Sequence, residues 1–171
     1  MPFSNFPNGF INGITIRGVP LNVLHPGKVF WVGNAAAAAL PNMKTASDGN
    51  KGTFNDPFST LDYAIGQCTA GRGDIIMVKP GHAENLAAAA AITSDVAGVA
   101  VVGLGAGSLR PKFSWTAATA DWNITANNLS FYNIEFQANF ADVASGIDVS
   151  GVTGLTFDSC YFTEAGTDLN W

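Results

Sequence analysis

The sequence is short of charged residues. Asp, Glu, Lys and Arg make up only 12% of its 171 residues, about half the ~25% that is usual for globular proteins. The net charge at pH 7 is −5, and the eight basic residues are scattered along the chain. Nucleic-acid binding needs cationic side chains gathered on one face, where they neutralise phosphates. We therefore expect no nucleic-acid partner.

Long hydrophobic runs are also missing. No stretch reaches the ~18 consecutive apolar residues of a membrane span, so we expect no membrane association. The opening MPFSNFPNG has neither a basic nor an apolar region, so a secretory signal peptide is not expected. Apolar residues still make up 47% of the chain, which is enough for a buried core.

Cysteine and histidine are rare and isolated. Cys68 and Cys160 lie far apart, and neither they nor His25 and His82 form a metal-binding spacing. A structural zinc site needs about four such ligands. We therefore expect no metal site and no cofactor, and two free thiols suit a reducing site of synthesis.

The first third of the chain is irregular. Residues 1–55 are interrupted by glycine and proline, with short strand signals only at Ile14–Ile16 and Val29–Val32. A polar, turn-rich loop follows at residues 44–56. The pattern predicts an extended N-terminal arm over 1–55 and one folded domain over 56–171.

A short helix is predicted at the start of that domain, over about residues 60–68. Ser59 or Thr60 supplies an N-cap hydroxyl, and Gly71 and Gly73 stop the helix. Apolar residues recur at helical spacing through it, at Leu61, Ala64, Ile65 and Cys68.

An internal repeat is the most informative feature of the sequence. Residues 128–136 (NLSFYNIEF) match residues 154–162 (GLTFDSCYF) at an offset of 26 residues. In each copy, two period-2 stretches are joined by one extra residue, which bends the chain while the same face stays inward. The matching positions are Leu129 with Leu155, Phe131 with Phe157, Ile134 with Cys160, and Phe136 with Phe162.

Repetition at 20–30 residues is typical of a solenoid, and short strands without long helices indicate a β-solenoid. Val99–Leu104 fits the same slot one coil earlier, and Ile75–Val78 is a further strand. Trp122–Thr125 and Gly146–Val149 indicate a third face. We predict an all-β domain of about three to four coils.

One segment carries a family resemblance. GTFNDPFSTLDYAI (52–65), followed by GDIIMVKPG (73–81) and Glu84, resembles the start of right-handed parallel β-helix proteins of the pectin-lyase-like type. The resemblance covers about residues 50–171 and implies that the helix caps the first end of the solenoid. Because this fold hosts lyases, hydrolases, tailspikes and non-catalytic virion proteins, it does not settle the activity.

The whole chain also resembles structural proteins of tailed phages. Openings like GITIRGVPL (13–21) and HPGKVFWV (25–32) precede a β-helix there. This second resemblance implies a virion protein that is assembled in the host cytoplasm.

The sequence supports an enzymatic function less well than a structural one. Lyases of this fold use a carboxylate cluster for calcium and a basic residue, but the arginines lie outside the acidic repeats. Hydrolases need paired carboxylates ~5–9.5 Å apart. Asp148 with Asp158, and Glu135 with Asp142, are candidate neighbours on successive coils, but no paired-Asp signature of hydrolases is present. We expect no catalytic residues and no enzyme.

Two binding readings remain as alternatives. Arg72-Gly73-Asp74 spells an adhesion tripeptide, although the simpler interpretation is a turn that leads into a strand. A tail spike or fibre module that binds host polysaccharide would use Trp115 and Trp122, although aromatics at strand spacing are more often core.

The ends of the solenoid favour an assembled protein. Nothing after Phe162 resembles a cap, and the last residues include Leu169 and Trp171. An open apolar end favours aggregation unless a partner covers it. We therefore expect a homo-oligomer, most simply a trimer, with Leu169 and Trp171 at subunit contacts.

These observations favour a phage virion structural protein, specifically a capsid decoration or cement protein. The arm and one face of the β-helix are expected to bind the major capsid protein and so stabilise the shell. The expected capsid contacts are apolar anchors with one charge: Phe6, Phe10, Ile14, Ile16, Arg17, Phe30 and Trp31.

Overall fold

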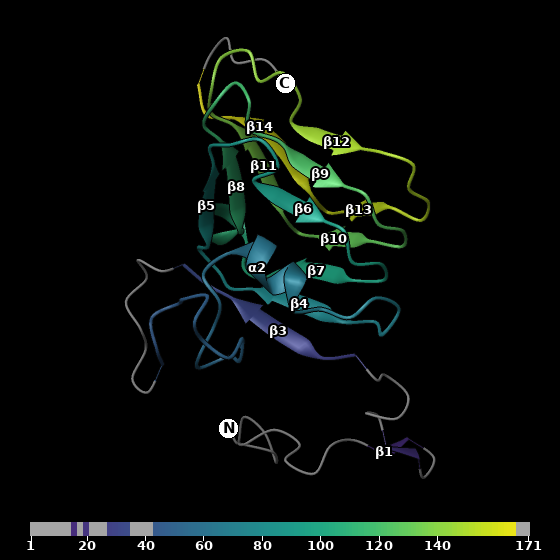
Figure 1. The fold of residues 1–171 in the computed structure, drawn as a ribbon. Helices are drawn as coiled ribbons and strands as arrows, with labels where there is room; N and C mark the ends of the chain where they lie inside the picture. The colour runs from purple at the N-terminus through teal and green to yellow at the C-terminus, as the bar shows by residue number, and fades with distance from the viewer. Residues whose placement is uncertain (1–14, 17–18, 21–26, 35–42, 167–171) are drawn as a thin grey trace.

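The protein is a parallel β-solenoid of about three turns (Figure 1). The computed structural model describes residues 15–16, 19–20, 27–34 and 43–166. Three parallel sheets run along the solenoid, with strand orders β3-β4-β7-β10-β13, β5-β8-β11-β14 and β6-β9-β12. Each turn therefore contributes one strand to each sheet.

The strands are short, as the sequence pattern predicts. The first turn contains β4 (Ile75–Val78), β5 (Ala83–Leu86) and β6 (Ile92–Ser94). The second contains β7 (Ala100–Gly103), β8 (Lys112–Trp115) and β9 (Trp122–Ile124). The third contains β10 (Ser130–Tyr132), β11 (Glu135–Ala138) and β12 (Ile147–Val149). Strands β13 (Thr156–Asp158) and β14 (Tyr161–Glu164) begin the next turn.

The internal repeat sets the register of the last turns. Phe131 pairs with Phe157 and Phe136 with Phe162, so the 26-residue offset of the repeat is confirmed. The extra residue at each bend is Asn133 or Ser159, and both have φ of 54°. This left-handed conformation turns the chain from the first sheet into the second while the same side chains stay inward.

The core lies inside the coil, where aromatic side chains stack from turn to turn. The Trp122 ring lies 5.4 Å from that of Phe131 and 5.1 Å from that of Phe113. Phe131 stacks in turn on Phe157 at 5.2 Å. Trp115 and Trp122 are fully buried, which confirms the core interpretation of these aromatics.

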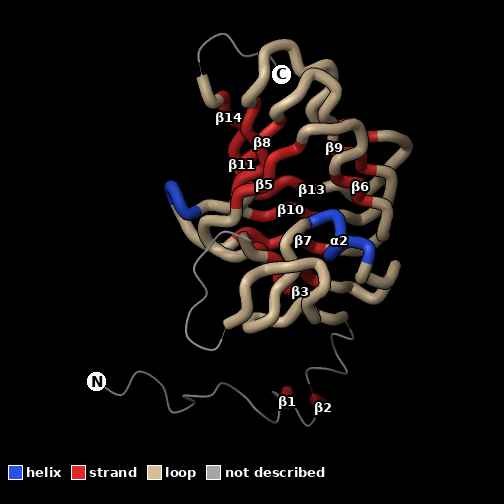
Figure 2. The backbone as a smooth tube through the Cα atoms, turned by 60° about the vertical axis from the view of Figure 1, so that its left-hand side comes forward, coloured by secondary structure: helices blue, strands red, loops and turns tan. Residues whose placement is uncertain are grey.

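The predicted helix is present as α2 (Leu61–Gly66), which packs beside the solenoid (Figure 2). Thr60 is the N-cap and accepts a hydrogen bond from the Tyr63 backbone N–H. Leu61, Ala64 and Ile65 are buried in the core. The role of α2 as a cap stays a prediction. No helix within the described ranges is long and apolar enough to cross a membrane.

Part of the predicted arm belongs to the solenoid. Strand β3 (Val29–Val32) pairs with β4 and so lies at the edge of the five-stranded sheet. The loop over residues 43–58 packs on it, with Trp31 N bonded to Gly52 O and Phe58 N bonded to Trp31 O. Of the remaining arm, only the backbone pair β1 (Thr15–Ile16) and β2 (Val19–Pro20) is described, so an extended arm stays a prediction.

Candidate functional site: the terminal rung

The candidate site is the end of the solenoid formed by its last strands, which we call the terminal rung. It consists of the inward positions that have no described strand above them. They lie on β12, on β13, on β14 and on the connections between them: Ile147, Val149, Leu155, Phe157, Cys160 and Phe162.

The turn below provides an internal comparison, because each position has a partner one turn earlier. Ile124 and Phe136 are 1% and 0% exposed, whereas Val149 and Phe162, which follow them in register, are 48% and 55% exposed. Burial raises the pKa of the Cys160 thiol, so this side chain behaves as a small apolar group. The terminal rung therefore repeats the chemistry of the core with less burial: Val149 and Phe162 are exposed, and the other four side chains are half-buried against the core.

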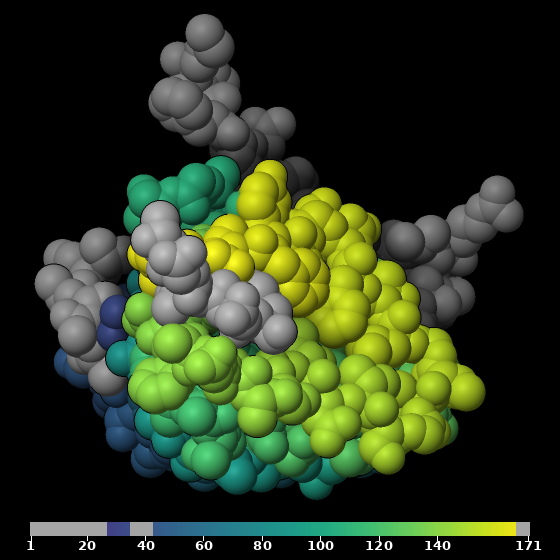
Figure 3. Space-filling model, turned by 90° about the horizontal axis from the view of Figure 1, so that it is seen from above, coloured from purple at the N-terminus to yellow at the C-terminus, as the bar shows by residue number. Residues whose placement is uncertain are grey.

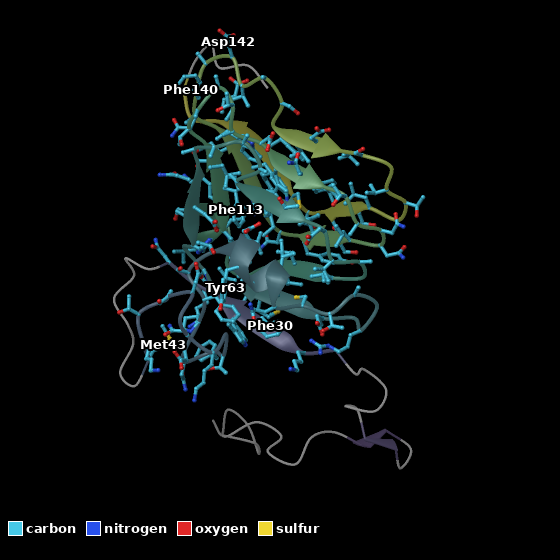
Figure 4. All side chains as sticks on the ribbon, viewed as in Figure 1. Phe30, Met43, Tyr63, Phe113, Phe140 and Asp142 are labelled. Carbon is cyan, nitrogen blue, oxygen red and sulfur yellow. The ribbon has the colours of Figure 1, made fainter. Side chains whose placement is uncertain are left out.

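The neighbouring loop enlarges this apolar end. Phe140, in the connection between β11 and β12, is 41% exposed and lies at the same end of the molecule (Figure 4). Seen from above, residues 140–166 form much of this face (Figure 3). Exposed apolar groups gathered in one place mark interaction surfaces more often than isolated ones do.

The predicted capsid contacts fall in three groups. Phe30 and Trp31 are half-buried in β3, where the Phe30 ring packs on Phe58 and the Trp31 ring meets Phe54 edge-on at 4.9 Å. Ile16 lies on β1, of which only the backbone is described. The other predicted contacts, and both predicted subunit contacts, lie outside the described residues: Phe6, Phe10, Ile14, Arg17, Leu169 and Trp171.

The adhesion tripeptide is not available to a receptor, so that alternative is wrong. Asp74 is fully buried, and its carboxylate accepts hydrogen bonds from the Arg72 guanidinium at 2.6 and 2.7 Å. The backbone N–H groups of Lys28 and Thr69 also donate to it, each at 2.7 Å. Asp74 thus fastens the chain before β3 to the turn that leads into β4, which supports the interpretation as a turn.

A buried polar pair escaped the sequence analysis, which treated His82 as isolated. His82 is 2% exposed, and its Nε2 lies 3.1 Å from Glu84 Oε2. The same carboxylate oxygen accepts a hydrogen bond from Leu61 N at the start of α2. The available signal was their spacing, because residues two apart on a strand face the same side. The pair joins the helix to the first turn.

The candidate catalytic carboxylates do not meet in register. Asp148 lies on β12 and pairs with Asn123, whereas Asp158 lies on β13 in a different sheet and pairs with Tyr132. Glu135 is on β11 and accepts a hydrogen bond from Thr163, while Asp142 is in the loop that follows (Figure 4).

The alternative in which tryptophans bind sugars can be compared with the structure. Trp115 and Trp122 are 0% exposed, so this alternative is wrong for these two side chains: the inward face of each strand carries them into the coil. Among the described residues, no group of three or more His, Cys, Asp and Glu could hold a metal ion.

Comparison with protein-family models, with curated proteins and with solved structures gives no match for this chain. The fold class is therefore defined by the strand pairing alone, as a parallel β-solenoid.

Proposed function

We propose that this chain is a structural protein of a phage virion, specifically a capsid decoration protein that binds the major capsid protein and stabilises the shell. The observation that carries the proposal is the exposed terminal rung, in which Val149 and Phe162 are about half exposed at positions that are buried one turn earlier. Such an end suits a protein that works in an assembly.

The physical reason is the one-dimensional build of a solenoid. Each turn of a solenoid buries its inward side chains only against its neighbours, so the exposed inward side chains of the terminal rung offer apolar surface that a partner can bury. Removing apolar surface from water contributes roughly 25 cal/mol per Å², and the half-exposed Val149 and Phe162 make part of that gain available to a partner. A second copy of the chain is the simplest partner, and a homotrimer is the state that we propose.

The capsid assignment rests on the resemblance of the opening segments to tailed-phage structural proteins. In this proposal, subunits meet through the terminal rung together with Leu169 and Trp171. The N-terminal arm reaches the major capsid protein. Binding that adds buried surface to the folded shell raises its resistance to heat by mass action.

The alternatives stay open. One alternative is a tail spike or fibre module that binds host polysaccharide. Trp115 and Trp122, the side chains expected to stack on the sugar, are buried, so they do not support this alternative. The other alternative is a small polysaccharide-cleaving enzyme. Its candidate carboxylates, Asp148 and Asp158, do not pair with each other, because they lie in register with Asn123 and Tyr132. No other observation favours either function.

The direct experiment uses empty shells of the virus that encodes the chain. The full chain is mixed with the shells and sedimented, and the melting temperature of the shells is recorded by calorimetry. We expect saturable co-sedimentation and a higher melting temperature. Failure of the full chain to bind the shells would overturn the capsid role, and turnover of a polysaccharide would replace it with the enzymatic alternative.

A matched pair of variants tests the terminal rung. Val149→Asp places a charge on the rung, and Leu109→Asp places the same charge on an equally exposed apolar residue of the 3₁₀ turn η1 (Gly107–Leu109). Light scattering should show that Val149→Asp reduces the mass from trimer to monomer while Leu109→Asp does not. A monomeric wild-type protein would contradict the assembly argument.

A further inference from the structure

A second feature lies at the opposite end of the solenoid, where the loop over residues 43–58 covers β3 and the end of β4. A cavity of about 450 Å³ lies there, within the ~300–1,000 Å³ range of small-molecule sites. Met43, one of the residues that line it, is labelled in Figure 4. The side chains that give it an apolar wall are Trp31, Met43, Phe54, Pro57, Pro80 and Leu104.

One buried cation lies in this apolar wall. Lys79 lines the cavity and is only 9% exposed. Its Nζ donates hydrogen bonds to Phe54 O at 2.5 Å and to Met43 Sδ at 3.0 Å, and it lies 4.3 Å from the centre of the Phe54 ring. Both neighbours also line the cavity, so the ammonium group sits within its wall.

The ammonium of Lys79 has no carboxylate partner among the described residues. The ion pairs found there join Lys44 to Asp56, Arg72 to Asp74, and His82 to Glu84. A buried charge is costly unless it is paired, and a carbonyl, a thioether and a ring face compensate only part of that cost. Burial accordingly lowers the pKa of Lys79.

Lys44 at the same cavity is a useful contrast. Its side chain is 67% exposed and its Nζ is already paired with Asp56 Oδ2 at 3.0 Å. An exposed ion pair of this kind contributes little to binding or stability. Of the two lysines that line the cavity, Lys79 is therefore the one whose charge lacks a carboxylate partner among the described residues.

We propose that this cavity binds a small organic acid, whose apolar body fills the space beside Trp31, Phe54 and Leu104 and whose carboxylate pairs with the ammonium of Lys79. The carboxylate supplies the missing counter-charge, and the aromatic and aliphatic walls exclude water from the pair, which strengthens it. This site is independent of the proposed capsid role, because it uses neither the terminal rung nor the N-terminal arm.

The test compares two probes of one shape. 1-Naphthoate carries the carboxylate, and 1-naphthamide is its neutral counterpart. Both are titrated into the full-length protein by calorimetry, with the fluorescence of the protein's tryptophans as a second signal. We expect naphthoate to bind about 10-fold more tightly than naphthamide, the usual gain from a charge-assisted hydrogen bond.

Two variants locate the binding. Lys79→Met keeps the apolar stem and removes the charge, so it should lower naphthoate affinity about 10-fold and leave naphthamide within about twofold. Lys44→Met should change neither affinity by more than about twofold, and Val149→Asp, at the terminal rung, should change neither. Thermal melting without probe checks that each variant is folded.

Three results would overturn the proposal. One is no naphthoate binding at millimolar concentration, and another is equal binding of naphthoate and naphthamide to the wild-type protein. The third is unchanged naphthoate affinity in folded Lys79→Met. The first two need no variant, so the test stands even if a substitution prevents folding.

Discussion

At the scale of single residues, Asp74 shows how one carboxylate can organise a turn. It is fully buried and accepts four hydrogen bonds, two of them from Arg72. Burial alone would raise its pKa, but the hydrogen bonds from Arg72 and from the backbone of Thr69 and Lys28 hold the pKa below its ordinary value of 3.8. The charged form is therefore the one that the fold stabilises.

Replacing this carboxylate should be costly. Asp74→Asn keeps the size of the side chain but leaves the Arg72 guanidinium without its counter-charge, so we expect a loss of about 3 kcal/mol in the free energy of unfolding. Urea denaturation at pH 7 measures it. Asp95→Asn, at an exposed position, is the control and should change stability by less than about 0.5 kcal/mol.

The same residue predicts how stability responds to acid. Because the folded-state pKa of Asp74 is lowered, its contribution is fully present above the ordinary value of 3.8. It is lost as the pH falls through the folded pKa. Between pH 5 and pH 2 the wild type should therefore lose more stability than Asp74→Asn. Parallel curves for the two proteins would contradict the charged network.

At the scale of elements, the bend between the first and second sheets depends on the side chain that occupies it. Asn133 has positive φ, and its Nδ2 donates to Gly103 O and to Gly105 O, both at 2.9 Å. Its Oδ1 accepts a hydrogen bond from Arg110 Nε at 2.8 Å. Asn133 therefore shapes its own bend and ties it to the bend one turn earlier.

Two substitutions at this bend separate backbone from side chain. Asn133→Gly keeps the left-handed conformation and loses the hydrogen bonds, at a cost of about 2 kcal/mol. Asn133→Ala loses both and should cost about 1 kcal/mol more. The midpoints of urea denaturation of the wild type and the two variants measure these differences in stability. At the matching bend, the one hydrogen bond of the Ser159 hydroxyl within the described part of the chain goes to neighbouring Asp158, so Ser159→Gly should be nearly neutral.

At the scale of the whole molecule, the two ends of the solenoid differ. At one end, β3, the loop over residues 43–58 and helix α2 pack against the first turn. At the other, the terminal rung leaves core-type side chains about half exposed. In the proposed assembly, the exposed end holds subunits together and the N-terminal arm reaches the shell.

Removing the arm should separate these two roles. Deleting residues 1–26 keeps β3 and its pairing with β4, so the protein should fold and remain a trimer by light scattering. The same protein should no longer co-sediment with shells. If the trimer dissociates instead, the arm rather than the terminal rung carries the subunit contacts.

Much of the fold could be predicted because its information is local. The alternation of apolar residues in 128–136 and 154–162 predicts which side chains face inward. The 26-residue offset between the two segments predicts which strands pair, as the structure confirms. Strand β5 was missed, because Glu84 occupies an inward position where the pattern calls for an apolar residue.

The pattern of residues alone therefore predicts the solenoid, the register of its last turns and the short helix, since spacing along the chain decides which way each side chain points. The structure then selects Thr60 rather than Ser59 as the N-cap of that helix. Spacing along the chain does not reveal that Asp74 is buried, that Glu84 bonds to the start of α2, or that Lys79 lines a cavity. The physical reason is distance along the chain. The groups around these charges include Lys28, Leu61 and Phe54, and only the coiled fold brings them within hydrogen-bonding reach.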